Sequence, residues 1–190
     1  MRELWLIRHG ETEWSLSGAH TGRTDIPLTA AGQANAAAIG RYFAGHRFAL
    51  VLTSPLQRAR ETSRLAGFAD EAVIDPDLRE WDYGDYEGLT TPQIQAANPQ
   101  WSLWTDGAPN GESPEQVAAR ADRVIARVLA VDGDVAIFAH GHILRVLAAR
   151  WLDLQPSAGR LFALSTGSVS TLGYERSTRV ILRWNLSPSA

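Results

Sequence analysis

Short apolar runs alternate with longer amphipathic segments along the chain. The apolar runs are rich in Val, Ile and Leu, and they predict strands at residues 3–8, 49–53, 134–139, 168–174 and 179–184. Between them the apolar positions take helical spacing, and helices are expected after Thr29, Ser54, Thr91, Ser113 and Gly141. This alternation is typical of βα units around a mostly parallel sheet, so the predicted fold class is α/β.

Two of these helices have a marked start, in which Ser is followed by Pro and then by Gln. Ser54-Pro55-Leu56-Gln57 and Ser113-Pro114-Glu115-Gln116 each combine a capping Ser with Pro at the first helical position. In the helix after Ser113 five apolar residues recur with helical spacing. The residues predicted to face the sheet are Val117, Ala121, Val124, Ile125 and Val128.

Two stretches depart from the βα pattern. The last two predicted strands are joined by residues 175–178 with no helix between them, so we expect an antiparallel hairpin at one end of the sheet. Residues 81–112 are rich in Gly, Pro, Trp and Asn and fit neither layer of such a fold. We interpret them as a lid-like excursion over the active face.

Length and composition narrow the class of protein. The chain has 190 residues, which predicts one domain over residues 1–190. Its net charge of −3 argues against nucleic acid or an anionic membrane as a partner. The absence of Cys excludes thiolate nucleophiles and Cys-based zinc sites. All 18 residues counted as Lys or Arg are Arg, which excludes a Schiff-base lysine and a P-loop lysine.

The apolar run near the N-terminus bears on where the protein is found. It extends only from Leu4 to Ile7, whereas the core of a signal peptide needs roughly 7 to 15 apolar residues. No stretch approaches the roughly 18 apolar residues of a membrane span. We therefore predict a cytoplasmic protein.

Arg and His side chains follow three predicted strands. The first strand ends at Arg8 and His9, the second leads into a helix that carries Arg58 in its first turn, and the third ends before His140. Open α/β sheets bind ligands beyond the carboxyl ends of their strands, and Arg offers paired donors to phosphate oxygens. These four residues therefore predict an oxyanion site for a small phosphorylated metabolite.

His9 is the predicted nucleophile of this site. Arg8 and Arg58 disfavour its protonation, so the imidazole is expected to be neutral near pH 7. The same cations stabilise the charge of an in-line phosphoryl transfer, for which the prediction invokes neither a metal nor a cofactor. The leaving alkoxide needs a proton, and Glu80 is the predicted donor because its aromatic neighbours would keep the carboxyl poorly hydrated.

Five blocks in order give the chain a resemblance to the histidine phosphatase, or phosphoglycerate mutase-like, superfamily. They are residues 6–14 (LIRHGETEW), residues 21–29 (TGRTDIPLT), residues 53–62 (TSPLQRARET), Glu80 with Tyr83-Gly84 and Glu87-Gly88, and His140-Gly141. The resemblance covers essentially the whole chain. It implies a three-layer α/β/α fold with an antiparallel edge, a phosphate-accepting His9, phosphate ligands Arg8, Arg58 and His140, and Glu80 as proton donor.

The resemblance also implies a substrate class. It assigns substrate contacts to Ser15, Thr21, Gly22, Tyr83, Gly141 and His142. Residues 13–18 and 79–88 look most like the sugar-bisphosphatase branch typified by fungal sedoheptulose-1,7-bisphosphatase, and Ser15 stands where the mutases usually have Asn. We therefore expect metal-independent hydrolysis of small sugar phosphates or bisphosphates, with self-association left open.

A cofactor-dependent phosphoglycerate mutase is the first alternative. The mutases carry Lys and paired Arg in the excursion region to hold the carboxylate and second phosphate of their substrate, whereas residues 81–119 contain no Arg. This disfavours a mutase. Because residues 81–119 contain no Arg, a second phosphate on the substrate would need a cation from another segment, and Arg23 is the nearest in sequence.

Two further alternatives come from other classes. A metal-dependent hydrolase would use His9, His140 and His142 with an acid near Glu80, and sensitivity to chelators would reveal it. A non-catalytic module that binds a phosphorylated ligand is expected to lack His9 or Glu80, and both are present.

The Trp residues and the remaining His residues can be interpreted as structural rather than catalytic. Trp81, Trp101 and Trp104 form either an apolar wall over the substrate or the packing of a short lid. His20 and His46 are expected at the surface, with His46 near a helix end, where a cation is favourable.

Overall fold

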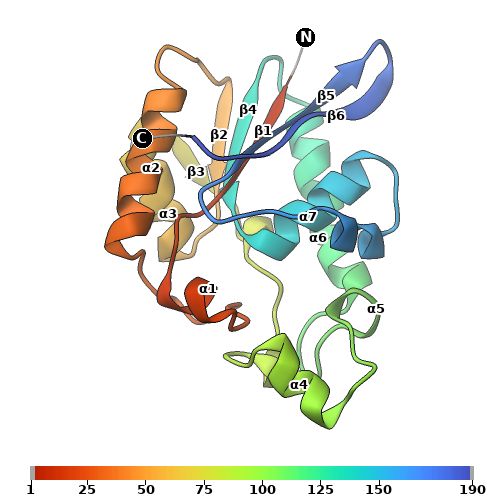
Figure 1. The fold of residues 1–190 in the computed structure, drawn as a ribbon. Helices are drawn as coiled ribbons and strands as arrows, with labels where there is room; N and C mark the ends of the chain where they lie inside the picture. Colours follow the sequence, from red (N-terminus) through yellow and green to blue (C-terminus); the bar gives the residue numbers. More distant parts are fainter. Residues whose placement is uncertain (1–2, 189–190) are drawn as a thin grey trace.

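The computed structural model describes residues 3–188, which form a six-stranded sheet flanked by helices (Figure 1). The strands, in their order across the sheet, are β3 (Ala72–Ile74), β2 (Leu50–Thr53), β4 (Val135–Ala139), β1 (Leu4–Arg8), β5 (Val169–Glu175) and β6 (Thr178–Leu186). The first four are parallel, whereas β5 and β6 pair antiparallel. The α/β class, the mostly parallel sheet and its antiparallel edge are confirmed.

Helices cover both faces of the sheet, with α2 and α3 on one face and α6 and α7 on the other (Figure 1). The α-helices are α1 (Glu13–Ser17), α2 (Ala30–Tyr42), α3 (Gln57–Ser63), α4 (Thr91–Ala97), α5 (Leu103–Asp106), α6 (Pro114–Leu129) and α7 (Gly141–Trp151). Shorter turns are η1 (Arg64–Phe68), η2 (Pro76–Leu78), η3 (Gly84–Tyr86) and η4 (Pro156–Leu161). Within residues 3–188 no helix has both the length and the apolar character needed to span a membrane.

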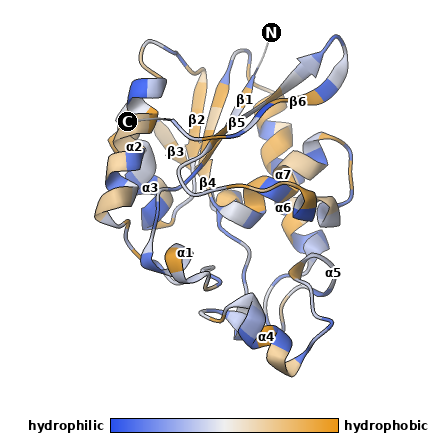
Figure 2. Ribbon diagram, viewed as in Figure 1, coloured by the Kyte–Doolittle hydropathy of each residue, from blue (hydrophilic) through white to orange (hydrophobic). Residues whose placement is uncertain are grey.

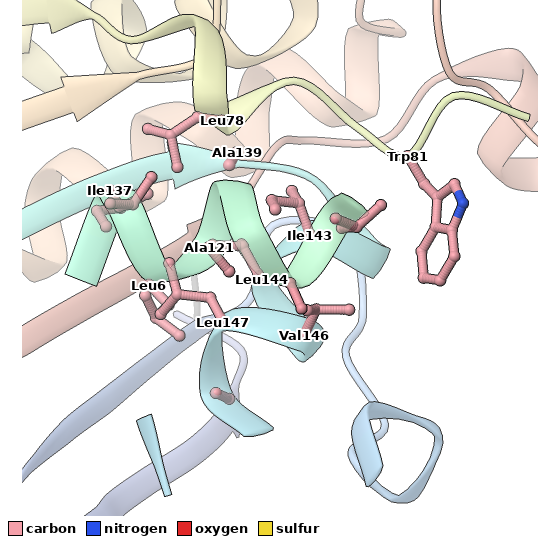
Figure 3. Close-up of a cluster of buried hydrophobic side chains, with 14 of the residues drawn as sticks. Leu6, Leu78, Trp81, Ala121, Ile137, Ala139, Ile143, Leu144, Val146 and Leu147 are labelled. Carbon is pink, nitrogen blue, oxygen red and sulfur yellow. The ribbon is translucent and has the colours of Figure 1, made fainter. Parts of the chain in front are cut away.

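The central strands direct alternate side chains into two hydrophobic cores. On β1, Leu4 and Leu6 belong to one core, and Trp5 and Ile7 belong to the other. Because parallel strands covered on both faces are apolar throughout, the central strands are mainly hydrophobic in Figure 2. Figure 3 shows how the first core joins the sheet to α6 and α7 through Leu6, Ala121, Ile137, Ile143, Leu144 and Leu147.

The five predicted strands are confirmed, with ends that differ by at most two residues. Helices also lie where they were expected after Thr29, Thr91 and Ser113 and at Gly141. Strand β3 was not predicted, because its three residues stand between charged neighbours and are too few to show a period. Helices α1 and α5 were not predicted either, because they are also too short to show a period.

The two marked helix starts have different outcomes. Ser113 caps α6 as predicted, Gln116 completes the capping box, and all five apolar residues expected to face the sheet are buried. The helix expected after Ser54 instead begins at Gln57, with Leu56 as its N-cap. Ser54 is fully buried at the end of β2, and its hydroxyl lies 2.7 Å from Nε2 of His140. The helix is therefore present, but the prediction of Ser54 as its cap was wrong, because the hydroxyl bonds His140 and accepts from the N–H of Leu56 at 3.3 Å before the helix begins.

The carboxyl ends of β1, β4 and β2 meet at one edge of the sheet, since the three strands are adjacent and parallel. Backbone hydrogen bonds continue the pairing beyond the strands. The N–H of His9 donates to the carbonyl of Ala139 at 3.0 Å, and the N–H of Ser54 donates to that of Phe138 at 2.9 Å. The strand register therefore places His9 beside the start of α7.

Residues 81–112 lie beyond the main layers and carry η3, α4 and α5 (Figure 1). The two ends of this excursion lie against each other and are joined by a backbone hydrogen bond. The N–H of Glu112 donates to the carbonyl of Asp82 at 2.9 Å. Gly84 has a left-handed φ of 48°, and a Cβ there would lie 2.1 Å from the carbonyl oxygen of Pro109. Only glycine allows this close approach of the two ends.

Candidate active site

A pocket of about 270 Å³ opens at the edge where the carboxyl ends of the strands meet. The predicted site residues that line it are Arg8, His9, Ser15, Thr21, Glu80, Tyr83, Gly141 and His142. Its other lining residues are Thr12, Gly18, Ala19, His20, Thr91, Arg145 and Leu164. Four predicted residues, Gly22, Arg23, Arg58 and His140, do not line it.

His9 is held in one tautomer. Its Nδ1 lies 2.7 Å from the carbonyl oxygen of Gly10, which can only accept, so Nδ1 carries the proton and Nε2 keeps its lone pair. Burial, followed by the charges of Arg58 and Arg8, holds the pKa of His9 well below its ordinary value of 6.5. The prediction of a neutral imidazole is confirmed, with burial rather than the cations as the largest cause.

His140 packs beside His9, with 5.1 Å between the ring centroids. Its Nδ1 accepts from Nε of Arg58 at 3.1 Å, and burial holds its pKa well below 6.5. The neutral ring therefore carries its proton on Nε2, which donates to Ser54 Oγ at 2.7 Å. In this structure the single N–H of His140 is used by Ser54 and is not presented to the pocket as a phosphate ligand.

Arg58 is fully buried and uses most of its donors on protein groups. Nη1 donates to the carbonyl of Thr24 at 2.9 Å, and Nη2 donates to those of Thr21 at 2.9 Å and Gly22 at 3.2 Å. Together with the bond to His140, four of its five N–H groups are occupied. Arg58 thus joins the loop 21–24 to His140. Among the described residues, one N–H of Nη1 has no protein partner.

Glu87 holds the same loop from the excursion. Its two carboxylate oxygens each lie 3.0 Å from the backbone nitrogen of Gly22, and Oε1 also accepts from that of Thr24 at 2.9 Å. A Cβ at Gly22 would lie 2.5 Å from the carbonyl oxygen of Trp81, so the loop is packed closely against the excursion. Gly22 therefore joins two walls of the pocket without facing its interior.

Arg8 is the cation that faces the pocket beside His9. Its Nη1 donates to the carbonyl of Leu164 at 2.5 Å, and its buried Nε has no hydrogen-bond partner. The guanidinium nevertheless lines the pocket, so its charge and its remaining donors are available to a phosphate there. A Cβ at Gly141 would lie 3.3 Å from Cζ and Nε of Arg8, so glycine leaves room for the guanidinium. These contacts fit Arg8 as the predicted phosphate ligand.

The carboxylate of Glu80 is held by three backbone N–H groups. Oε1 accepts from Trp81 at 2.9 Å and from Ile143 at 3.0 Å, and Oε2 accepts from His142 at 3.0 Å. Two of these donors belong to the first turn of α7, where N–H groups lack helical partners. The expected poor hydration of Glu80 agrees with its burial, but the hydrogen-bond partners of the carboxylate are main-chain N–H groups, and the indole N–H of Trp81 donates to the carbonyl of Glu112.

Tyr83 and His142 form an uncharged pair next to Glu80. The Tyr83 hydroxyl lies 2.7 Å from Nδ1 of His142, which is 3.8 Å from Oε2 of Glu80. Burial, reinforced by the charge of Glu80, raises the pKa of Tyr83 well above 10.0. Burial and the charge of Arg145 hold the pKa of His142 well below 6.5. The pair therefore offers neutral hydrogen-bonding groups to a substrate.

Ser15 and Thr21 line the pocket with hydroxyl groups that are already engaged. Ser15 Oγ donates to the carbonyl of Thr12 at 2.8 Å and completes the capping box of α1. Thr21 Oγ1 donates to the carbonyl of Ala19 at 3.1 Å. Each oxygen can still accept a hydrogen bond from a substrate.

Arg23 is not brought to the pocket. Its side chain is 80% exposed, pairs with Asp82 and borders a separate cavity. The sequence prediction that Arg23 holds a second phosphate therefore has no support from its position.

The sequence analysis missed Arg145, the second guanidinium of the pocket. Its Nε and Nη2 donate to the carbonyls of Gly159 and Arg160 at 3.0 and 3.2 Å, and its Cζ lies 4.4 Å from the ring centroid of Trp104. Among the residues that the structure describes, no carboxylate lies within ion-pair distance of it. A signal was present, since residues three apart on a helix share a face and Arg145 follows His142 by three.

His20 was also misplaced by the sequence analysis. It lines the pocket, 4.7 Å from Tyr83 and 6.0 Å from His142 between ring centroids, and burial lowers its pKa. His46 is partly exposed just after the end of α2, as predicted, with Nε2 3.0 Å from a carboxylate oxygen of Asp134. His20 was taken for a surface residue because nothing periodic surrounds it.

The three Trp residues of the excursion pack it rather than line the pocket. Trp81 and Trp101 are buried, and the indole N–H of Trp101 donates to the carbonyl of Gly107 at 2.9 Å. Trp104 lies against Arg145 and His142. Of the two interpretations, packing of a short lid agrees with these contacts.

The metal-dependent alternative gains no support from the geometry. Over residues 3–188, no three or more His, Asp or Glu side chains are grouped so that they could hold a metal ion. His9 and His140 instead have their ring nitrogens ordered by Gly10, Arg58 and Ser54.

Comparisons with known proteins agree with this arrangement. The family model for the histidine phosphatase superfamily (branch 1) matches residues 4–187. An acid phosphatase of Mycobacterium tuberculosis is 42% identical over 180 residues, which are 93% of this chain and 88% of that protein. Sedoheptulose 1,7-bisphosphatase of Saccharomyces cerevisiae is 39% identical over 181 residues, 78% of this chain and 67% of that protein. A solved structure of an open reading frame product from Mycobacterium tuberculosis superposes with a TM-score of 0.93 at 39% identity, covering 99% of both chains.

Proposed function

The chain belongs to branch 1 of the histidine phosphatase superfamily and is a phosphatase of phosphorylated substrates, and we propose that it hydrolyses small phosphomonoesters through a phosphohistidine at His9. One observation carries the proposal. His9 is neutral, its Nδ1–H is fixed on a carbonyl, and its Nε2 lone pair is free in a pocket that Arg8 also lines.

The first step forms the bond between Nε2 of His9 and phosphorus and breaks the ester P–O bond. Arg8 lines the pocket and binds the phosphoryl oxygens, on which charge is spread in the transition state, and the buried positive charge of Arg58 adds to their electrostatic stabilisation. Glu80 enters this step in its protonated form and gives that proton to the leaving alkoxide. In the second step water attacks phosphorus, its proton passes to Glu80, and the N–P bond breaks to release phosphate.

Sugar phosphates or bisphosphates are the proposed substrates. The pocket of about 270 Å³ suits a phosphoryl group with a small polar body, and its far side presents uncharged His142, His20 and Tyr83. Arg145 supplies the cation that the excursion lacks, so a second phosphate has a partner in the same pocket. Arg145, which lies outside residues 81–119, therefore supports a bisphosphate as the substrate.

The covalent intermediate is tested by rapid quench with labelled substrate at neutral pH. The trapped label is expected to be acid-labile and stable in alkali, as a phosphoramidate is, and to map to His9. The His9→Gln variant is expected to lose the label and about 10⁴-fold or more of kcat. A label on another residue would overturn the proposal.

Arg145 is tested by the Arg145→Met variant with matched substrates. Loss of a hydrogen bond to a charged group is worth about 1.5–3 kcal/mol, so kcat/KM for a sugar bisphosphate should fall roughly 10- to 100-fold. The corresponding monophosphate should change by less than about 3-fold, because it leaves Arg145 without a partner. Equal losses for both substrates would remove Arg145 from a second phosphate site.

A phosphoglycerate mutase is a second candidate, because Arg145 can hold a carboxylate as well as a phosphate. The assay supplies 3-phosphoglycerate with a bisphosphoglycerate primer and, separately, a panel of sugar esters with EDTA present. We expect phosphate release from the sugar esters to exceed formation of 2-phosphoglycerate. Faster interconversion than hydrolysis of every ester tested would favour the mutase.

A further inference from the structure

Glu80 stands on a segment with no helix or strand of its own. Residues 79–83 follow η2 and lead into the excursion without regular hydrogen bonding. A general acid must be held within a fraction of an ångström of its productive place, since small displacements cost large factors in rate. The carboxylate is ordered by α7. Its main chain is ordered by two residues that do not line the catalytic pocket.

Arg120 of α6 binds this segment through its carbonyl groups. Its Nη1 donates to those of Asp77 at 2.6 Å and Arg79 at 2.9 Å, and its Nη2 donates to that of Glu80 at 3.4 Å. The side chain is only 13% exposed. One guanidinium therefore holds three carbonyls that lead up to the acid.

Glu112 completes the arrangement from the far end of the excursion. It accepts from Nε and Nη2 of Arg120, both at 2.8 Å, and its Oε2 accepts from the backbone N–H of Asp82 at 3.0 Å. Its own carbonyl receives the indole N–H of Trp81 at 2.9 Å. The bidentate pair thus reaches the main chain on both sides of Glu80.

We propose that Arg120 and Glu112 act as positioning residues that hold Glu80 in place for proton transfer, an inference that rests on the proposed role of Glu80. Both border a second cavity of about 600 Å³, which meets the catalytic pocket at Glu80. Replacing either one therefore removes hydrogen bonds at the wall of a cavity rather than packing inside the hydrophobic core.

The leaving group provides a readout that a purely structural role would not move. An alkoxide needs a proton as the ester bond breaks, whereas 4-nitrophenolate leaves without one. The measured quantity is kcat/KM, which reports steps up to formation of the phosphoenzyme. For Arg120→Met we expect a loss of about 10- to 100-fold with an alkyl phosphate and less than about 3-fold with 4-nitrophenyl phosphate.

Arg123→Met is the matched control on the same helix. Arg123 is 54% exposed and pairs with the side chain of Asp77 rather than with the main chain. Its kcat/KM should be unchanged with both substrates. Glu112→Gln provides a second test variant, because it keeps the shape of the side chain and should show the same selectivity as Arg120→Met at smaller amplitude.

The Glu80→Gln background separates the possible failures. There, Arg120→Met should cause no further loss with the alkyl substrate, because its effect passes through Glu80. If Glu80→Gln is selective for alkyl substrates but Arg120→Met is not, or if the two losses multiply, the positioning role is overturned alone. If Glu80→Gln itself shows no selectivity, the assignment of Glu80 as proton donor is overturned, and the positioning role with it.

Discussion

Two walls enclose the catalytic pocket, each made of residues that line it and of residues that hold these in place, and the two are stabilised by different kinds of contact. The sheet wall, formed by Arg8, His9, Arg58 and His140, follows strands whose backbone pairing continues past their ends. The excursion wall, formed by Glu80, Tyr83, Glu87 and Glu112, has no strand pairing. It is held by side chains that bind the main chain of distant segments.

The difference predicts how far the effect of a substitution spreads in each wall. Backbone pairing survives most side-chain changes, so a substitution in the sheet wall removes mainly the chemistry of that residue. In the excursion wall one carboxylate or guanidinium orders several main-chain groups, so a substitution there moves residues that it does not touch. Four experiments sharpen or break this contrast.

Arg58→Ala should have the largest effect of the four, because Arg58 is the member of the sheet wall that also holds a loop. We expect kcat to fall about 100-fold or more, since His140 loses its donor and the phosphoryl group loses a cation. Steady-state kinetics measure this, with Arg60→Ala, exposed on the same helix, as the control. Near-normal kcat would place Arg58 outside the chemistry.

Glu87→Gln tests the excursion wall. The carboxylate orders two backbone N–H groups of the loop that receives Arg58, and Gln keeps one acceptor oxygen. We expect about 1–3 kcal/mol less stability to unfolding and roughly a 10-fold loss of kcat/KM. Urea unfolding and kinetics check both. Asp85→Asn, an exposed acid of the same stretch, should change neither. A loss of stability with unchanged kinetics would show that the loop does not support the sheet wall.

The pH dependence should mainly reflect the three His residues whose pKa lies well below its ordinary value, two of the sheet wall (His9 and His140) and one at the start of α7 (His142). Burial holds the folded pKa of each well below 6.5. Between the folded and unfolded pKa values the unfolded chain binds more protons, so stability is fully present above about pH 6.5 and falls as the pH drops below it. The rate needs neutral His9, so the acidic limb of kcat/KM should lie well below pH 6.5. A limb at or above 6.5 would show that His9 is not buried in the working enzyme.

Arg23→Ala should have the smallest effect. Its partner is Asp82, but the Arg side chain is 80% exposed, and such pairs contribute about 0–1 kcal/mol. We expect kinetics within about 2-fold of the wild type for mono- and bisphosphates. A selective loss with bisphosphates would return Arg23 to the site and show that the excursion wall moves when substrate binds.

Sequence patterns predicted the sheet wall more fully than the excursion wall. Apolar runs ending in Arg8-His9 and before His140 are enough to bring these residues together, because parallel strands share an edge. Glu80 was identified as well, but its surroundings were not. Arg120 and Glu112 are 40 and 32 positions from Glu80 in the sequence. Nothing in their local patterns distinguishes them from solvated charges, because their role depends on how the excursion folds back.

The contact between the two ends of the excursion affects how the substrate specificity of this enzyme can change in evolution. Residues 82–84 and 109–112 lie side by side, so the stretch between them is a closed loop whose ends are already joined. Changing the length of such a loop costs little entropy, about 0.6 kcal/mol for each doubling. Helix α4, which contributes Thr91 to the pocket, belongs to that loop, whereas Glu80 lies outside it. New specificities can therefore be grafted onto this scaffold by exchanging the loop, with the proton donor left where it is.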